Sequence, residues 1–146
     1  MAQSDPLAIL NRLQAMHVRS LPMYLASAPP WSPDPNSAEL TALRHIAEDQ
    51  QLMADRISSV ILEHGGTVAA SEFPMEFTDL HDLSIDFLIP QVRRRQEEEI
   101  DYLRSSIERL QNAPAPRAIA EEALGAAIAH LDTLKELSRP KLGIAG

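Results

Sequence analysis

Prolines and glycines break this 146-residue chain into four long segments. Residues 29–35 hold four prolines, Gly65 and Gly66 follow the second segment, and Pro114 and Pro116 precede the fourth. Both residue types end helices, because proline lacks a backbone N–H and glycine accepts a left-handed conformation. Between the breaks, apolar residues recur every three or four positions, which is the period of an α-helix. No segment shows a convincing strand pattern, so the chain is predicted to be all-α.

The pattern predicts four helices in a single domain, followed by a short tail. Pro22 lies inside the first helical pattern and predicts a kink there. Asn36, with Glu39 three residues further on, predicts a capping box before the second helix. Thr78 is the expected cap of the third. The predicted helices span residues 5–28, 37–64, 79–111 and 117–137, and the tail comprises residues 138–146.

The linker of residues 67–78 decides how the helices connect. Twelve residues extend about 40 Å, and the second predicted helix is about 42 Å long. The linker is therefore just long enough to cross a bundle lengthwise, whereas a simple up-and-down bundle would need a shorter one. We accordingly expect a left-handed four-helix bundle with a long crossover between its second and third helices.

The composition excludes several classes of site and partner. The chain has no cysteine, which excludes disulfides, thiolate metal sites and a cysteine nucleophile. A net charge of -8 and an aromatic content of 4% argue against nucleic acid as a partner. Residues 1–6 do not resemble a signal peptide, and no run of 18 apolar residues predicts a membrane-spanning helix. We therefore expect no membrane partner, with the cytoplasm as the default location.

Three arginines and three glutamates flank Gln96 in the charge run of residues 93–99. Arg93 and Glu97 are four residues apart, as are Arg94 and Glu98, and such pairs stabilise a helix only weakly. The outer members of the run are therefore predicted to lie on a solvated face.

Polar side chains interrupt the apolar stripe of each predicted helix near its middle. His17, Gln50, Gln96 and His130 lie on these stripes, and Glu99 is a borderline member. Their matching depths predict a single polar layer through the core. A buried polar group without a partner costs about 1–3 kcal/mol. The layer should therefore pair internally, or around a metal ion or water.

Three further residues are secondary candidates for the site: Asp49, His81 and Asp82. His45 and Asp49 lie four residues apart off the main stripe and are predicted to form a surface pair. His81 and Asp82 fall in the first turn of the third predicted helix, where a carboxylate complements the helix dipole.

Three stretches resemble the bacterioferritin branch of the ferritin-like proteins. They are residues 10–25, which include His17 and Tyr24, then Ala54-Asp55-Arg56 with Ile61-Leu62 and Gly65, and finally His130-Leu131-Asp132 with Leu134. The resemblance covers about half the chain. It implies a ferritin-like four-helix bundle and a homo-oligomer assembled through dimers.

The resemblance also implies that most ligands of the family's di-iron centre are replaced. His17 takes the position of a bridging glutamate, and Tyr24 that of a tyrosine seven residues later. Gln50 and Met53 take the positions of a Glu-x-x-His motif. This centre has therefore lost anions that hold iron in the family.

The third and fourth predicted helices have also lost ligands of the family's di-iron centre. His130 keeps the histidine of a second Glu-x-x-His motif, but Ala127 replaces its glutamate. Gln96 or Glu99 would take the place of the ligand on the third helix. Gln51 stands where the family's haem-binding methionine would fall, so haem binding by that route is not supported.

Three functions remain open at this stage. In the first, His17, His130 and Glu99 bind one divalent metal ion, because two histidines and a carboxylate suit Zn(II) or Fe(II). In the second, the core layer is hydrogen-bonded, includes Gln50, Gln96 and Tyr24, and serves assembly or partner binding. The third and least favoured is a retained ferroxidase or iron-storage activity.

A small-molecule pocket near the aromatic residues of the linkers is a further alternative. The residues concerned are Trp31, Phe73, Pro74, Met75 and Phe77. The favoured interpretation is that they plug one end of the bundle.

Overall fold

The computed structural model describes residues 5–80 and 83–137, and the regular secondary structure of this part of the chain is helical. It contains α1 (Pro6–Val18), α2 (Leu21–Ser27), α3 (Ala38–Glu63), α4 (Ile85–Arg109), α5 (Pro114–Leu137) and a 3-10 helix, η1 (Met75–Asp79). These residues include no strand, only an isolated bridge between Trp31 and Ser84. The all-α prediction is confirmed. None of the helices in the described ranges combines the length and apolar character needed to span a membrane.

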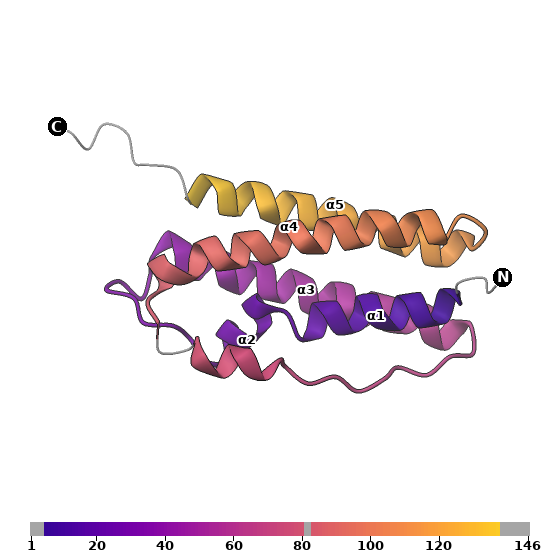
Figure 1. The fold of residues 1–146 in the computed structure, drawn as a ribbon, viewed down its shortest axis with the longest axis horizontal. Helices are drawn as coiled ribbons and strands as arrows, with labels where there is room; N and C mark the ends of the chain where they lie inside the picture. Colours follow the sequence, from indigo (N-terminus) through magenta and orange to yellow (C-terminus); the bar gives the residue numbers. More distant parts are fainter. Residues whose placement is uncertain (1–4, 81–82, 138–146) are drawn as a thin grey trace.

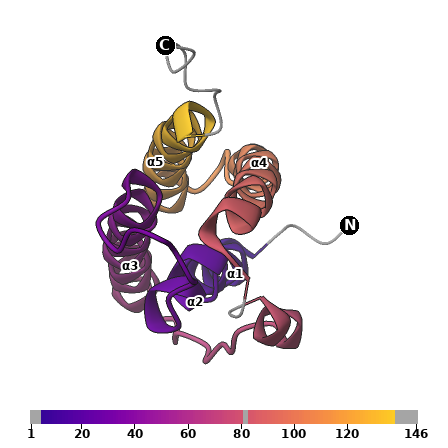
Figure 2. The same cartoon turned by 90° about the vertical axis from the view of Figure 1, so that its left-hand side faces the viewer.

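The long helices lie side by side along one axis of the molecule (Figure 1). Seen along this axis, α1 with α2, α3, α5 and α4 surround a common core in that order (Figure 2). Helices α3 and α4 run in the same direction, and α1 and α5 run in the opposite one. Two consecutive long helices are therefore parallel, and the chain between them must return along the molecule.

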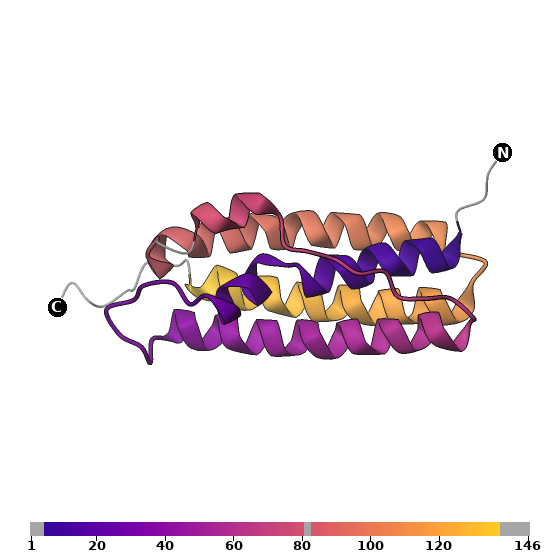
Figure 3. The ribbon, with the colours of Figure 1, turned by 90° about the horizontal axis from the view of Figure 1, so that it is seen from below.

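The segment between α3 and η1 makes this return alongside α1 (Figure 3). It leaves α3 through a turn in which Gly65 has a φ of 82° and the Gly66 N–H donates to the Ile61 carbonyl at 2.9 Å. This is a Schellman motif, and Gly65 supplies the left-handed residue that it requires. The Asn11 side chain then holds the segment on α1, donating to the Thr67 carbonyl and accepting from the Ala69 N–H, both at 2.9 Å.

The prediction of one kinked helix over residues 5–28 is wrong, because the structure has two separate helices there. α1 ends at Val18, and α2 starts at Leu21 after the N-cap Ser20. The Ser20 hydroxyl accepts the Met23 N–H at 3.2 Å. Pro22 therefore lies in the first turn of a new helix, where its missing N–H leaves no hydrogen bond unmade.

Three other predicted boundaries differ from the structure. The capping box is wrong, because Ser37 rather than Asn36 caps α3 and accepts the Leu40 N–H at 3.2 Å. Thr78 is not a cap: residues 75–79 form η1, and α4 begins only after Ser84. α5 begins at Pro114, three residues before the predicted start, because proline suits the first turn of a helix.

The apolar core consists of two clusters, one on each side of the buried polar residues along the bundle axis. α3, α4 and α5 each contribute to both clusters, whereas α1 contributes to one and α2 to the other. In every case the change falls at the predicted polar positions. One cluster contains Leu10, Leu13, Ile57, Ile61, Ile100, Leu103, Ile119 and Ala123, with further residues. The other contains Leu21, Leu25, Leu43, Ile46, Leu88, Val92 and Leu134, with further residues.

Candidate functional site

Five buried polar residues separate the two apolar clusters. His17 on α1, Gln50 on α3, Gln96 and Glu99 on α4, and His130 on α5 are each 9% exposed or less. The two clusters lie on either side of these positions along α3, α4, α5 and the α1–α2 segment, so the residues form a layer across the middle of the molecule. Their hydrogen bonds determine what this layer can bind.

His17 is tied to its own helix. Its Nδ1 lies 2.7 Å from the Leu13 carbonyl, which can only accept, so the proton must be on Nδ1. Burial lowers the pKa of His17, the bond to Leu13 opposes this change, and nearby His130 adds to it. The ring is therefore neutral at neutral pH.

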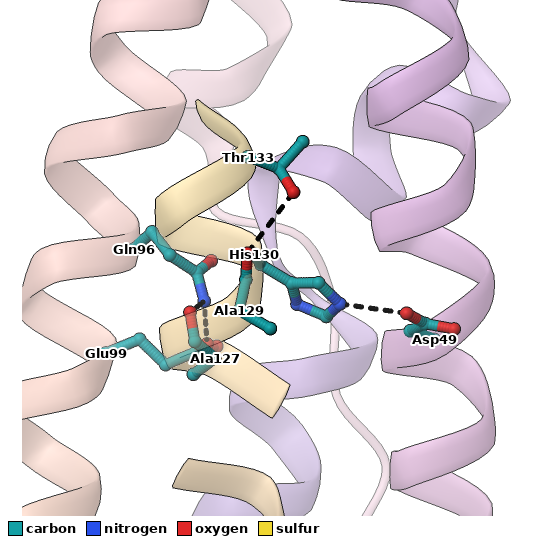
Figure 4. Close-up of polar contacts among 7 residues, drawn as sticks. All are labelled: Asp49, Gln96, Glu99, Ala127, Ala129, His130 and Thr133. Carbon is teal, nitrogen blue, oxygen red and sulfur yellow. Dashed lines mark hydrogen bonds and ion pairs between the residues drawn. The ribbon is translucent and has the colours of Figure 1, made fainter. Parts of the chain in front are cut away.

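His130 pairs with a residue on another helix. Its Nε2 lies 3.0 Å from an oxygen of Asp49 on α3, as Figure 4 shows. The prediction of a His45–Asp49 surface pair is therefore wrong about the partner, although Asp49 is largely exposed. The two histidines of the layer thus have separate partners, Leu13 and Asp49.

Glu99 and Gln96 form a third polar unit, one turn apart on α4. The Gln96 Nε2 donates to a Glu99 oxygen at 2.9 Å and to the Ala127 carbonyl of α5 at 3.2 Å (Figure 4). Burial raises the pKa of Glu99 to about 7, although the bond from Gln96 favours the ionised form. At neutral pH this carboxyl is therefore divided between its neutral and charged forms.

Gln50 is held at the break between α1 and α2. The Ser20 hydroxyl donates to the Gln50 Oε1 at 2.6 Å and accepts from the backbone of α2. These two bonds favour the amide orientation in which Oε1 faces Ser20. The Gln50 Nε2 is buried and has no hydrogen-bond partner among the described residues.

The three predicted metal ligands do not form one group. Within residues 5–80 and 83–137, no three His, Asp or Glu side chains are placed to hold a metal ion. His17, His130 and Glu99 are engaged by Leu13, Asp49 and Gln96 respectively. The secondary candidates His81 and Asp82 lie outside the described residues.

Tyr24 was predicted to belong to the polar layer, but the structure places its ring in an aromatic cluster. The centroid of the ring lies 5.3 Å from that of Phe73 and 5.6 Å from that of Phe77. Phe77 is buried, whereas Trp31 and Met75 are exposed. The aromatic linker residues therefore do not form a single pocket.

A cavity of about 680 Å³ lies against the polar layer. Gln50, Gln96 and Glu99 lie on its wall, together with apolar side chains that include Val92 and Phe77. The wall is built from α1, the start of α2, α3, α4 and the segment that crosses beside α1. The crossing segment thus helps to enclose a space next to the layer.

Several residues of this cavity were not assigned to a candidate site from the sequence. Arg12 and Arg19 lie on its wall, as does Arg95, whose guanidinium lies 4.8 Å from the Phe77 ring centroid and 3.4 Å from Glu76. Arg95 could not be distinguished from its neighbours in the charge run of residues 93–99. Only the path of the crossing segment brings Phe77 over Arg95 on α4. Arg12 and Arg19 are seven residues apart, a spacing that also suits a solvated face.

Comparison with known proteins gives no match: no protein-family profile, curated protein or solved structure is significantly similar to this chain.

Proposed function

We propose that this chain is a ferritin-like four-helix bundle that binds a small organic molecule beside its polar layer. The observation that carries the proposal is the position of Gln50, Gln96 and Glu99 on the wall of the cavity. Its volume of about 680 Å³ lies within the range of small-molecule sites, which are mostly apolar with a few polar groups.

The path of the chain supports the ferritin-like part of the proposal. α3 and α4 are parallel and are joined by a connection that runs the length of the molecule (Figure 3). One long crossover is the feature that distinguishes ferritin-like bundles from simple up-and-down bundles. The sequence resemblance to bacterioferritins points to the same topology.

The chemistry of the layer favours an organic ligand over a metal ion. At the positions where bacterioferritins carry anionic glutamate ligands, the resemblance places the neutral side chains of Gln50 and His17. Glu99 is the one carboxyl among the five buried residues of the layer, and its pKa of about 7 leaves it partly protonated at neutral pH. Such a layer offers a cation little charge, whereas its amides suit an organic molecule.

The proposal is tested by titrating the ¹⁵N-labelled full chain with 2-naphthol and following its amide shifts. Saturable shifts around the cavity are expected. A Met16→Trp change adds bulk at the cavity wall and should weaken binding about tenfold or more, whereas Ala8→Trp, on the exposed side of the same helix, should not.

Two outcomes would contradict the proposal. Shifts that are absent, or that are unaffected by Met16→Trp, would remove the cavity as a binding site. Elemental analysis of the purified chain would instead favour the single-metal alternative if it found one Zn or Fe per chain.

Self-association is a second property that the resemblance implies, and we include it in the proposal. Leu52 and Leu62 on α3 are 62% and 60% exposed, and large apolar side chains on an outer face suit contact with a second copy. Native mass spectrometry should find a dimer or a larger homo-oligomer; a monomer at micromolar concentration would exclude this part.

A further inference from the structure

Positive side chains gather at the cavity although the whole chain carries a net charge of -8. Arg12 on α1, Arg19 directly after α1 and Arg95 on α4 all lie on its wall. Arg12 and Arg19 form no ion pair with another described residue, and Arg95 contacts Glu76 only at 3.4 Å. Two of these three guanidinium groups are thus not neutralised by a described carboxylate.

The acidic residues at the cavity oppose this charge only in part. Glu72 and Glu98 lie on the wall and are exposed, as are Arg12 and Arg19, so solvent screens exposed charges of both signs. Glu99 is buried, and burial favours its neutral form. Below neutral pH, where Glu99 is neutral, the wall carries three arginines against two glutamates.

The buried polar atoms of the wall that lack partners are donors. They are the Gln50 Nε2 and the Arg95 Nε, neither of which has a hydrogen-bond partner among the described residues. The Ser20 hydroxyl favours this orientation of the Gln50 amide, because exchanging the amide atoms would lose the bond that the hydroxyl donates to Oε1. Glu99 adds a third donor whenever it is protonated. A ligand that supplies acceptor oxygens would complement this set.

Apolar side chains provide the rest of the wall. Leu21, Phe77 and Val92 are nearly fully buried and line the cavity, and Met16 and Pro74 lie beside them. A purely ionic ligand would leave this surface uncovered. An apolar body of aromatic or aliphatic carbon would bury it.

The geometry points to an organic anion as the ligand, a carboxylate carried on an apolar body, with Arg12, Arg19 and Arg95 selecting the charge. This inference rests on the proposed ligand-binding function of the same cavity. The carboxylate supplies acceptors for guanidinium and amide donors. A cationic ligand would place its charge near three arginines and find its nearest buried carboxyl only partly ionised at neutral pH.

The experiment compares three probes that share one naphthalene body on the full chain: 2-naphthoate, 2-naphthol and 2-naphthylmethylammonium. Isothermal titration at neutral pH should give an affinity for 2-naphthoate about tenfold or more above that for 2-naphthol, since a charge-assisted hydrogen bond adds that much. The ammonium probe should bind more weakly than either of the others.

A double variant, Arg12→Gln with Arg19→Gln, separates charge selection from binding itself. It should bring the affinity for 2-naphthoate to within about threefold of that for 2-naphthol measured on the same variant. Arg104→Gln is the matched control, because Arg104 is exposed on α4 and does not line the cavity. The control should keep the full preference for the anion.

The possible failures are distinguishable. If 2-naphthol binds in the cavity but 2-naphthoate binds no tighter, the anion inference is overturned and the ligand-binding function stands. If the double variant weakens both probes equally, the arginines support the fold and do not select charge, which also overturns the inference. If no probe binds, the proposed function itself fails.

Discussion

Glu99 should make the stability of this protein fall as the pH rises, and replacing it with glutamine should remove that fall. The side chain is 8% exposed, and burial raises its pKa from 4.5 to about 7. Between these two values the folded state binds more protons than the unfolded state. The stability contributed by the neutral carboxyl is therefore complete below pH 4.5 and is lost as the pH rises through 7.

The size of the effect follows from the shift. Each pKa unit corresponds to 1.36 kcal/mol, so a rise from 4.5 to about 7 costs about 3 kcal/mol of folding free energy at alkaline pH. In Glu99→Gln the neutral amide can still accept the hydrogen bond that Gln96 donates at 2.9 Å. The variant should be close to wild type at pH 5 and more stable by up to about 3 kcal/mol at pH 9.

Urea denaturation at several pH values between 5 and 9 measures this difference directly. His17 titrates in both proteins, so its contribution cancels when the two free energies are subtracted. Glu97→Gln, an exposed change two residues away, should shift stability by less than about 0.5 kcal/mol at every pH. A wild-type-minus-variant difference that stays constant over this range would refute the reasoning.

Three further predictions concern other parts of the fold. His17 has a lowered pKa, so in the variant lacking the Glu99 carboxyl the stability measured by urea should fall as the pH drops below 6.5. Gly66→Ala would place a carbon 2.9 Å from a methyl group of Ile61 and should cost about 1–2 kcal/mol, whereas Gly125→Ala meets nothing within 4 Å and should add about 0.5–1 kcal/mol in the same assay. Ser20→Ala removes a helix cap and the partner of a buried amide, and thermal unfolding should show a loss of about 2 kcal/mol that Ser20→Thr largely avoids.

The polar positions of the core could be recognised in the sequence because a helix has a fixed period. His17, Gln50, Gln96 and His130 fall on apolar stripes, and all four are buried. The length of the linker also predicted a lengthwise crossing, because the reach of an extended chain is nearly constant. Both inferences depend on local geometry, which the sequence carries directly.

The partners of those residues could not be predicted in the same way. Asp49 was assigned to His45 on its own helix, but it pairs with His130, 81 residues further along the chain. Ser20 received no role, because its contact with Gln50 exists only where the first helix breaks. Such pairings depend on how the helices are rotated against one another, which the period of a single helix does not fix.

The sequence by itself determined an all-α chain, the ends of the helical segments to within six residues and the buried polar positions near the middle of the bundle, but not the break between α1 and α2. Its periodicity and its proline and glycine breaks are sufficient for this, because each acts within a few residues. Only the tertiary structure decided that the buried histidines have separate partners and that the crossing segment brings Phe77 over Arg95 beside a cavity. The physical reason is that a cavity is the space left between helices, so its shape and charge come from the whole packing arrangement and from no single segment.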